Sequence, residues 1–156
     1  MGIKNNTRNR ADKRDNRSVG IKRYELYKSA ISHVQNAQSN GFYIEAITVI
    51  ESLISDRLES RLSNLLNKNI GFKNLGYLIR EIEKRETDDS LRTIVCTDLN
   101  TWKEKRNSVI HEMVKLEDDN FSTWEERLKD LPMIAEVGFG IYRKIDNRVQ
   151  SLQRIR

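Results

Sequence analysis

The sequence predicts an all-α domain, an antiparallel bundle of about five helices. Apolar residues recur every three or four positions along most of the chain, which is the period of a helix that buries one face. The 156 residues include a single proline, and 33% of them are charged, a composition that favours a helical domain over a sandwich or barrel. A chain of this length can bury a core of its own, and no repeat or second domain is visible.

Breaks in the apolar pattern set the bounds of the first three helices. The first spans about 21–39 and ends at Ser39-Asn40-Gly41, because Asn and Gly suit the left-handed residue that follows a helix. The second spans about 42–67 and ends in the sequence 67–71, which contains two asparagines and a glycine. The third is shorter and carries four apolar residues at helical spacing: Leu75, Leu78, Ile79 and Ile82.

A long fourth helix is predicted over about 90–115. The preceding Thr87-Asp88-Asp89-Ser90 offers side chains that accept hydrogen bonds from the unpaired backbone amides of a first turn. The apolar stripe of this helix includes Trp102, which we therefore expect in the core.

The last helix is predicted after a polar loop. Ser122 and Glu125 have the spacing of a capping box, in which each side chain accepts from the other residue's backbone N–H. We expect the helix to bend near Pro132 and to be loosened at Gly138 and Gly140.

The positive charge of the chain is confined to its N-terminal segment. Residues 1–23 contain eight basic and two acidic residues, so the segment carries +6, whereas the other residues carry −1 of the total of +5. With almost no apolar residues, the segment lacks the surface needed to order itself, so we expect a flexible basic tail over 1–20 before a helical domain over 21–156. The tail either follows nucleic-acid phosphates or serves as a solubilising leader.

Several functions are disfavoured by what the sequence lacks. No apolar run approaches the roughly 18 residues that span a bilayer, and the polar N-terminus resembles no signal peptide, so we expect a cytoplasmic protein without membrane contact. The single cysteine, Cys96, excludes an internal disulfide, and the apolar Ile94 and Val95 before it favour a buried thiol. One cysteine and two distant histidines give no zinc spacing, and we expect no metal and no cofactor.

The residues best suited to chemistry lie late in the fourth helix. Arg106 and Asn107 precede His111, and Val109 and Ile110 fill the gap with apolar side chains. Trp102 lies one turn before Arg106. In an all-helical chain this segment resembles the motif of the HEPN superfamily, an arginine followed by a polar residue, three further residues and a histidine near the end of a long helix.

These residue types match the requirements of RNA cleavage by attack of the 2'-hydroxyl on the adjacent phosphate. A histidine can act as acid or base because its ordinary pKa of about 6.5 leaves both forms populated near neutrality. An arginine is always charged and meets two phosphate oxygens at once. Asn107 could orient the imidazole or a phosphate, and Lys103 and Lys105 could bind the RNA backbone, although a charged helix face explains both lysines equally well.

Helical geometry adds a constraint on this pair. In an α-helix, His111 is rotated by about 140° from Arg106 and lies about 7.5 Å further along the axis, so the two do not share a narrow face. One histidine also cannot be base and acid in the same step. A symmetric pair of chains would place two copies of each residue in one groove and meet both requirements.

The resemblance implies the same arrangement. HEPN ribonucleases are known as homodimers with a composite, metal-independent site for RNA, and many belong to toxin–antitoxin pairs or phage defence, which implies an antitoxin or regulatory protein as a further partner. An acidic or polar residue on an earlier helix often supports the site in that family. Glu45, Glu51 and Asp56 are the candidates here, and each can also be an ordinary surface residue.

Three functional hypotheses therefore stand. The first is a metal-independent HEPN endoribonuclease that acts through Arg106 and His111. The second is a catalytically inactive HEPN-like module for dimerisation or RNA binding, in which the arginine is a structural ion-pair partner. The third is a helical adaptor whose basic tail binds nucleic acid or an acidic partner.

Overall fold

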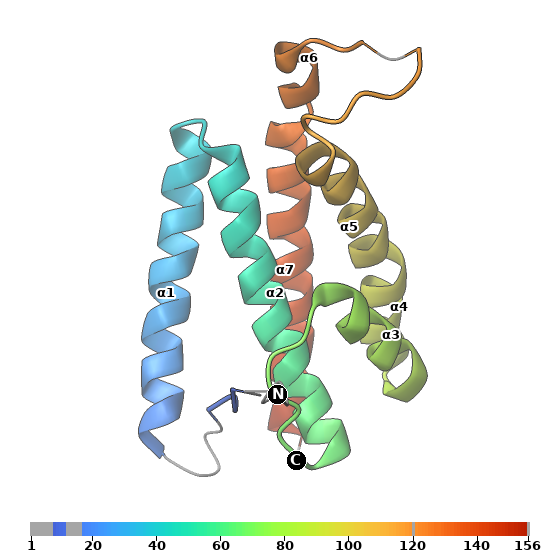
Figure 1. Ribbon diagram of the computed structural model, residues 1–156. Helices are drawn as coiled ribbons and strands as arrows, with labels where there is room; N and C mark the ends of the chain where they lie inside the picture. Colours follow the sequence, from blue (N-terminus) through green and yellow to red (C-terminus); the bar gives the residue numbers. More distant parts are fainter. Residues whose placement is uncertain (1–7, 12–16, 120, 156) are drawn as a thin grey trace, which may run out of the picture.

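The computed structural model describes residues 8–11, 17–119 and 121–155, which form helices joined by loops, with no strand among these residues (Figure 1). Five main helices, with one short helix before the last, confirm the predicted all-α class within the described part of the chain. None of the helices described is both long enough and apolar enough to cross a membrane.

The first two helices follow the predicted pattern. Helix α1 spans Arg17–Ser39 and α2 spans Tyr43–Leu66. Gly41 (φ 78°) turns the chain between them and Asn67 (φ 49°) ends α2, both in the left-handed conformation that these residue types adopt most readily. Helix α1 begins four residues earlier than expected, since the half-buried Val19 extends its apolar face.

Helix α3 is short and amphipathic, as predicted. It spans Leu75–Arg85 and begins at Asn74, whose side chain accepts a 2.8 Å hydrogen bond from the backbone N–H of Tyr77. This cap satisfies one of the backbone donors that a first helical turn leaves unpaired.

The predicted fourth helix exists, but its winding changes along its length. It consists of α4 (Asp89–Thr93), the π-helical η1 (Ile94–Leu99), α5 (Asn100–Arg106) and the π-helical η2 (Asn107–His111). It ends at His111 rather than near 115, and Arg127 donates to the backbone oxygens of Glu112 and Met113 just beyond it. The helix is therefore closed by a side chain from α6, a partner that periodicity does not reveal.

The capping box after the loop lies one residue later than predicted. Thr123 accepts from the backbone N–H of Glu126 and Glu126 accepts from that of Thr123, at the start of α6 (Trp124–Leu128). The expectation of Ser122 and Glu125 was wrong because Thr123 has the extended backbone (φ −69°, ψ 166°) that an N-cap requires.

The predicted last helix is divided at residues 129–130 into α6 and α7, so the chain is interrupted before Pro132 where a bend was expected, and α7 runs without a break over Leu131–Arg154. Pro132 lies in the first turn, where its missing N–H would have no partner, and it starts the helix instead of bending it. Gly138 is buried against the Trp102 indole, and a Cβ there would lie 2.7 Å from the ring. The glycine thus permits close packing.

The core is centred on α2, which packs against α1, α3 and α7, while η1 and α5 pack against α7 (Figure 1). Its fully buried side chains come from most of the main helices: Val34, Ile47, Ile50, Ile54, Leu58, Leu62, Leu78, Ile82, Leu91, Leu99, Tyr142 and Ile145. Trp102 is also in the core, as predicted, and its Nε1 donates to the Ile134 carbonyl at 2.8 Å. Cys96 is half-buried rather than buried, and that partial burial raises the pKa of its thiol.

A buried ion pair fixes α2 to the chain that leaves α3. Arg61 on α2 donates to the carboxylate of Glu86, and both side chains are almost completely inaccessible to solvent. Close to it, Asp88 pairs with Arg148 of α7. These two contacts hold the start of the fourth helix against the rest of the bundle.

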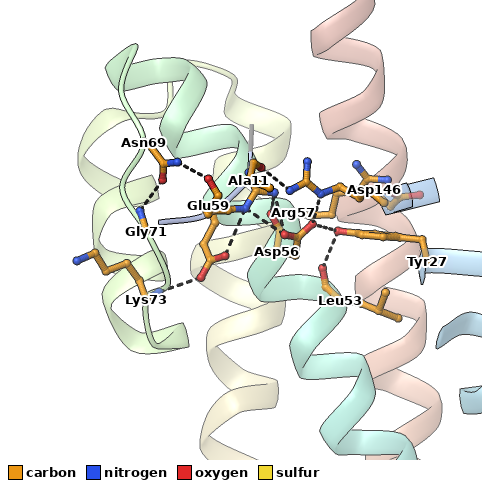
Figure 2. A network of polar contacts seen from close by, with 12 residues as sticks. Ala11, Tyr27, Leu53, Asp56, Arg57, Glu59, Asn69, Gly71, Lys73 and Asp146 are labelled. Carbon is orange, nitrogen blue, oxygen red and sulfur yellow. Dashed lines mark hydrogen bonds and ion pairs between the residues drawn. The ribbon is translucent and has the colours of Figure 1, made fainter. Parts of the chain in front are cut away.

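Part of the predicted basic tail lies against the bundle. Arg10 is 6% exposed and donates to the Asp56 carboxylate at 2.8 and 3.0 Å, in the network that Figure 2 shows around Asp56 and Glu59. The Asn69 side chain donates to the Arg10 carbonyl. The low apolar content of the segment did not predict this contact, because the carboxylates of Asp56 and Glu59 on α2 bind it. Residues 1–7 and 12–16 of the predicted tail lie outside the described residues.

Candidate functional site

Arg106, His111 and Glu51 meet at one end of the bundle. Arg106, the last residue of α5, is 8% exposed. Its Nη2 donates to Glu51 Oε1 at 2.9 Å, and its Nη1 lies 3.1 Å from His111 Nε2. The structure therefore brings the two residues of the sequence motif together and adds a carboxylate from α2.

The π-helical winding of η2 accounts for the contact between Arg106 and His111. A π-helix bonds residue i to i+5, so residues five apart lie one above the other, as residues three or four apart do in an α-helix. The rotation of about 140° that we calculated for an α-helix is consequently wrong here. No second helix from another chain is needed to join the arginine to the histidine.

The contact fixes the role of each nitrogen. A guanidinium can only donate, so His111 Nε2 must accept, which requires the tautomer that carries its hydrogen on Nδ1. The His111 side chain is exposed at the end of its helix, whereas Arg106 is enclosed beneath it. A ligand at this end of the bundle would meet the imidazole first.

Two polar atoms at the site are buried without a hydrogen-bond partner among the described residues: Arg106 Nε and Asn107 Oδ1. Such atoms are uncommon in folded proteins, because an unsatisfied buried polar group costs about 1–3 kcal/mol. Asn107 Oδ1 thus makes no hydrogen bond to the His111 ring in this structure. The side-chain oxygen of Asn107 can therefore still accept a hydrogen bond from another group.

Glu51 is the one of the three acidic candidates on α2 that reaches the motif. Glu45 Oε1 lies 2.6 Å from His33 Nε2, and Asp56 binds Arg10 and the Tyr27 hydroxyl. Glu51 alone follows the buried Ile47 by four residues and precedes the buried Ile54 by three, which places it on the core-facing side of α2. That position within the apolar stripe is the signal that could have singled it out.

The predicted RNA-binding lysines do not join this cluster. Lys103 Nζ pairs with Glu104 at 3.0 Å. Lys105 lines a groove of about 500 Å³ between the fourth helix and α7, beside Trp102 and Lys144. Within the described residues, no hydrogen bond or ion pair links either lysine to Arg106 or His111.

A second groove lies next to His111, at the junction of η2, the following loop and α6. Its volume is about 540 Å³, and its walls carry four acidic residues, Glu112, Glu117, Glu126 and Asp130, and two basic residues, Lys115 and Arg127. An acidic excess repels a polyanion, so this groove does not favour an RNA strand.

Comparison with known proteins identifies no family: no protein-family model, no curated protein and no solved structure matches the chain. Across the residues that the structure covers, no group of three His, Cys, Asp or Glu side chains has the arrangement of a metal site. The chemistry of Arg106, His111 and Glu51 therefore carries the functional argument by itself.

Proposed function

We propose that the protein is a metal-independent endoribonuclease of HEPN type, built on an antiparallel HEPN-like bundle and active in the cytoplasm in phage defence or a toxin–antitoxin system. The observation that carries the proposal is the 3.1 Å contact between Arg106 Nη1 and the exposed His111 Nε2. This contact puts a permanent cation and a proton acceptor within reach of one phosphodiester.

In the proposed reaction, His111 Nε2 removes the proton of the ribose 2'-hydroxyl. The oxygen attacks the adjacent phosphorus, and the bond to the 5'-oxygen breaks, which leaves a 2',3'-cyclic phosphate and a 5'-hydroxyl end. Arg106 turns its Nη1 from the imidazole to the non-bridging oxygens, whose negative charge increases in the transition state. Glu51 is a positioning residue that holds the guanidinium during this step.

The leaving 5'-oxygen must be protonated, and a second His111 in a homodimer would supply that proton. The exposure of His111 favours such an arrangement, because a partner chain can approach it. Lys103 and Lys105 would bind the RNA backbone on either side. An antitoxin or regulatory protein would restrain the dimer.

A second candidate is a catalytically inactive HEPN-like module for dimerisation or RNA binding. It is favoured by the burial of Arg106 and its ion pair with Glu51, since a structural arginine has the same contacts. The acidic groove beside His111 favours the dimerisation role of this module over RNA binding, because that surface does not attract RNA.

The deciding experiment is cleavage of mixed RNA in EDTA by wild type, His111→Ala and His33→Ala, with identification of the product ends. His33 is the matched control, because it is the other histidine and pairs with Glu45 on the surface. We expect wild type and His33→Ala to leave 2',3'-cyclic phosphates and His111→Ala to be slower by about 10²–10⁴-fold. No cleavage by wild type would reject the nuclease in favour of the inactive module, and equal cleavage by all three would reject His111 as its catalytic residue.

A further inference from the structure

A small polar cavity lies at the other end of α2. It has a volume of about 260 Å³, and the residues that line it include Arg10, Arg23, Arg57, Ser63 and Gln150. Ser63 follows Glu51 by twelve residues, about 18 Å along the helix, so the cavity is separate from the Arg106 site. No acidic side chain lines it in the part of the chain that the structure covers.

The arginines of this cavity are held in place by carboxylates outside its lining. Arg10 and Arg23 both pair with Asp56, Arg23 through Nε at 3.4 Å. Arg57 pairs through Nε with Asp146, as Figure 2 shows, and its guanidinium lies 4.3 Å from the centre of the Tyr27 ring. A guanidinium has five N–H donors. Among the described residues, Arg10 also donates from Nη2 to Asp56 and Arg23 from Nη2 to the Ala11 carbonyl, which leaves the Nη1 groups of both for a ligand. The groups are thus oriented before any ligand arrives.

Ser63 provides an independent sign of a ligand. The residue is 4% exposed, and its Oγ is buried without a hydrogen-bond partner among the described residues. A hydroxyl in that state is normally satisfied by protein, water or ligand. Because Ser63 is also part of the cavity wall, an anion in the cavity could accept its hydrogen.

We propose that this cavity binds a phosphate group, with the guanidinium groups of Arg10, Arg23 and Arg57 and the Ser63 hydroxyl as donors. Planar guanidinium groups match phosphate oxygens in geometry as well as in charge. The volume is below the range of roughly 300–1,000 Å³ that holds drug-sized ligands, so it suits a phosphate or pyrophosphate group and not a whole nucleotide. The group belongs either to a small phosphorylated molecule or to the end of a nucleic acid.

The nearby carboxylates restrict which anions bind. Asp56, Glu59 and Asp146 together balance the charge of the three arginines, so net attraction for anions in general is small. Recognition then depends on several directed N–H and O–H donors, which a tetrahedral phosphate can use at once and chloride cannot. The proposal is independent of the proposed nuclease.

The test is isothermal titration calorimetry of the full chain with two probes, pyrophosphate and a short 5'-phosphorylated DNA strand that lacks the 2'-hydroxyl needed for cleavage. Ser63→Ala is compared with Ser52→Ala, the same change at an exposed position of α2. Arg23→Gln is compared with Arg92→Gln, which removes the same charge from an exposed surface pair.

We expect saturable binding of at least one probe to wild type, weakened about tenfold or more by Ser63→Ala and by Arg23→Gln and unchanged in the two controls. Pyrophosphate binding assigns the cavity to small phosphorylated molecules, and binding of the DNA alone assigns it to a nucleic-acid end. Ser63→Ala removes a hydroxyl that has no partner, so its melting temperature should equal that of wild type; if it does not fold, Arg23→Gln decides. No binding of either probe, or binding that both substitutions leave unchanged, would overturn the proposal, whatever the outcome for RNA cleavage.

Discussion

Two arginine–glutamate pairs join α2 to the neighbouring chain, and they differ in how much of the arginine they use. Arg61 donates from Nε at 2.7 Å and from Nη2 at 2.8 Å to the two oxygens of Glu86. Arg106 gives Glu51 one hydrogen bond from Nη2, directs Nη1 to His111 and leaves Nε unpaired. The Arg61–Glu86 pair is therefore bidentate, whereas Arg106 keeps N–H donors for a further group.

The carboxylates show the same difference. Glu86 is inaccessible to solvent and also accepts the backbone N–H groups of Thr87 and Asp88, both at 3.0 Å. Burial alone would raise the pKa of Glu86, but the hydrogen bonds from Arg61 and the backbone outweigh it and lower the pKa. The Glu51 side chain is 28% exposed. The Arg61–Glu86 pair is thus closed to solvent, whereas the Arg106–Glu51 pair is partly open.

The largest expected effect of removing one member of these ion pairs is on the stability of the fold. Glu86→Ala leaves the Arg61 cation buried without its partner, which should lower the free energy of unfolding by about 3–5 kcal/mol. Glu51→Ala should cost less although Arg106 is also buried, because the partly exposed position of Glu51 lets water reach the guanidinium and Arg106 keeps its contact with His111. Urea denaturation of both variants measures the difference, and equal losses would show that the two pairs do not differ in kind.

The second largest expected effect is on RNA cleavage and rests on the proposed nuclease function. Arg106→Lys keeps the charge but cannot contact Glu51 and a phosphate with one planar group, so cleavage should fall by about 10²–10³-fold. Arg61→Lys is the matched control, and its cleavage rate per folded molecule should equal that of wild type. Single-turnover cleavage checks both, and an unchanged rate for Arg106→Lys would assign Arg106 a structural role only.

The smallest expected effect is on the pH dependence of stability. Because the folded-state pKa of Glu86 lies below its unfolded value of about 4.3, its contribution to stability is fully present above that pH and is lost as the pH falls through the folded pKa. Burial raises the pKa of Glu59, so that residue acts in the opposite direction: its ionisation reduces stability as the pH rises from about 4.3 through its folded pKa.

Urea denaturation from pH 7 to pH 3 tests the contribution of Glu86. The fall in unfolding free energy below about pH 4.3 should be smaller in Glu86→Gln than in wild type. A variant that follows the wild-type profile throughout would show that other carboxylates cause the acid sensitivity.

Most of the fold could be predicted from the sequence because local patterns determine it. The ends of α1 and α2 follow from the glycine and asparagine residues Gly41 and Asn67, which adopt left-handed conformations there. The π-helical winding of η2 could not be predicted, since an apolar pattern that continues along a helix does not reveal where its winding changes.

Only part of the candidate site could be predicted from the sequence, for a related reason. Arg106 and His111 are close in sequence, so a motif can find them. Glu51 is distant in sequence and resembles Glu45 and Asp56 until tertiary packing assigns each carboxylate a different partner. The burial of Arg10 was missed likewise, because composition does not say which carboxylates a basic segment will meet.

The winding of η2 links the spacing of the motif to the pitch of its helix. A separation of five residues aligns Arg106 with His111 only while the intervening turn is wide, whereas a separation of four would align them on an ordinary α-helical turn. Loss of one residue, such as Ser108, together with a return to α-helical winding would therefore preserve the contact. A return to α-helical winding alone would instead turn the imidazole to about 140° from the guanidinium.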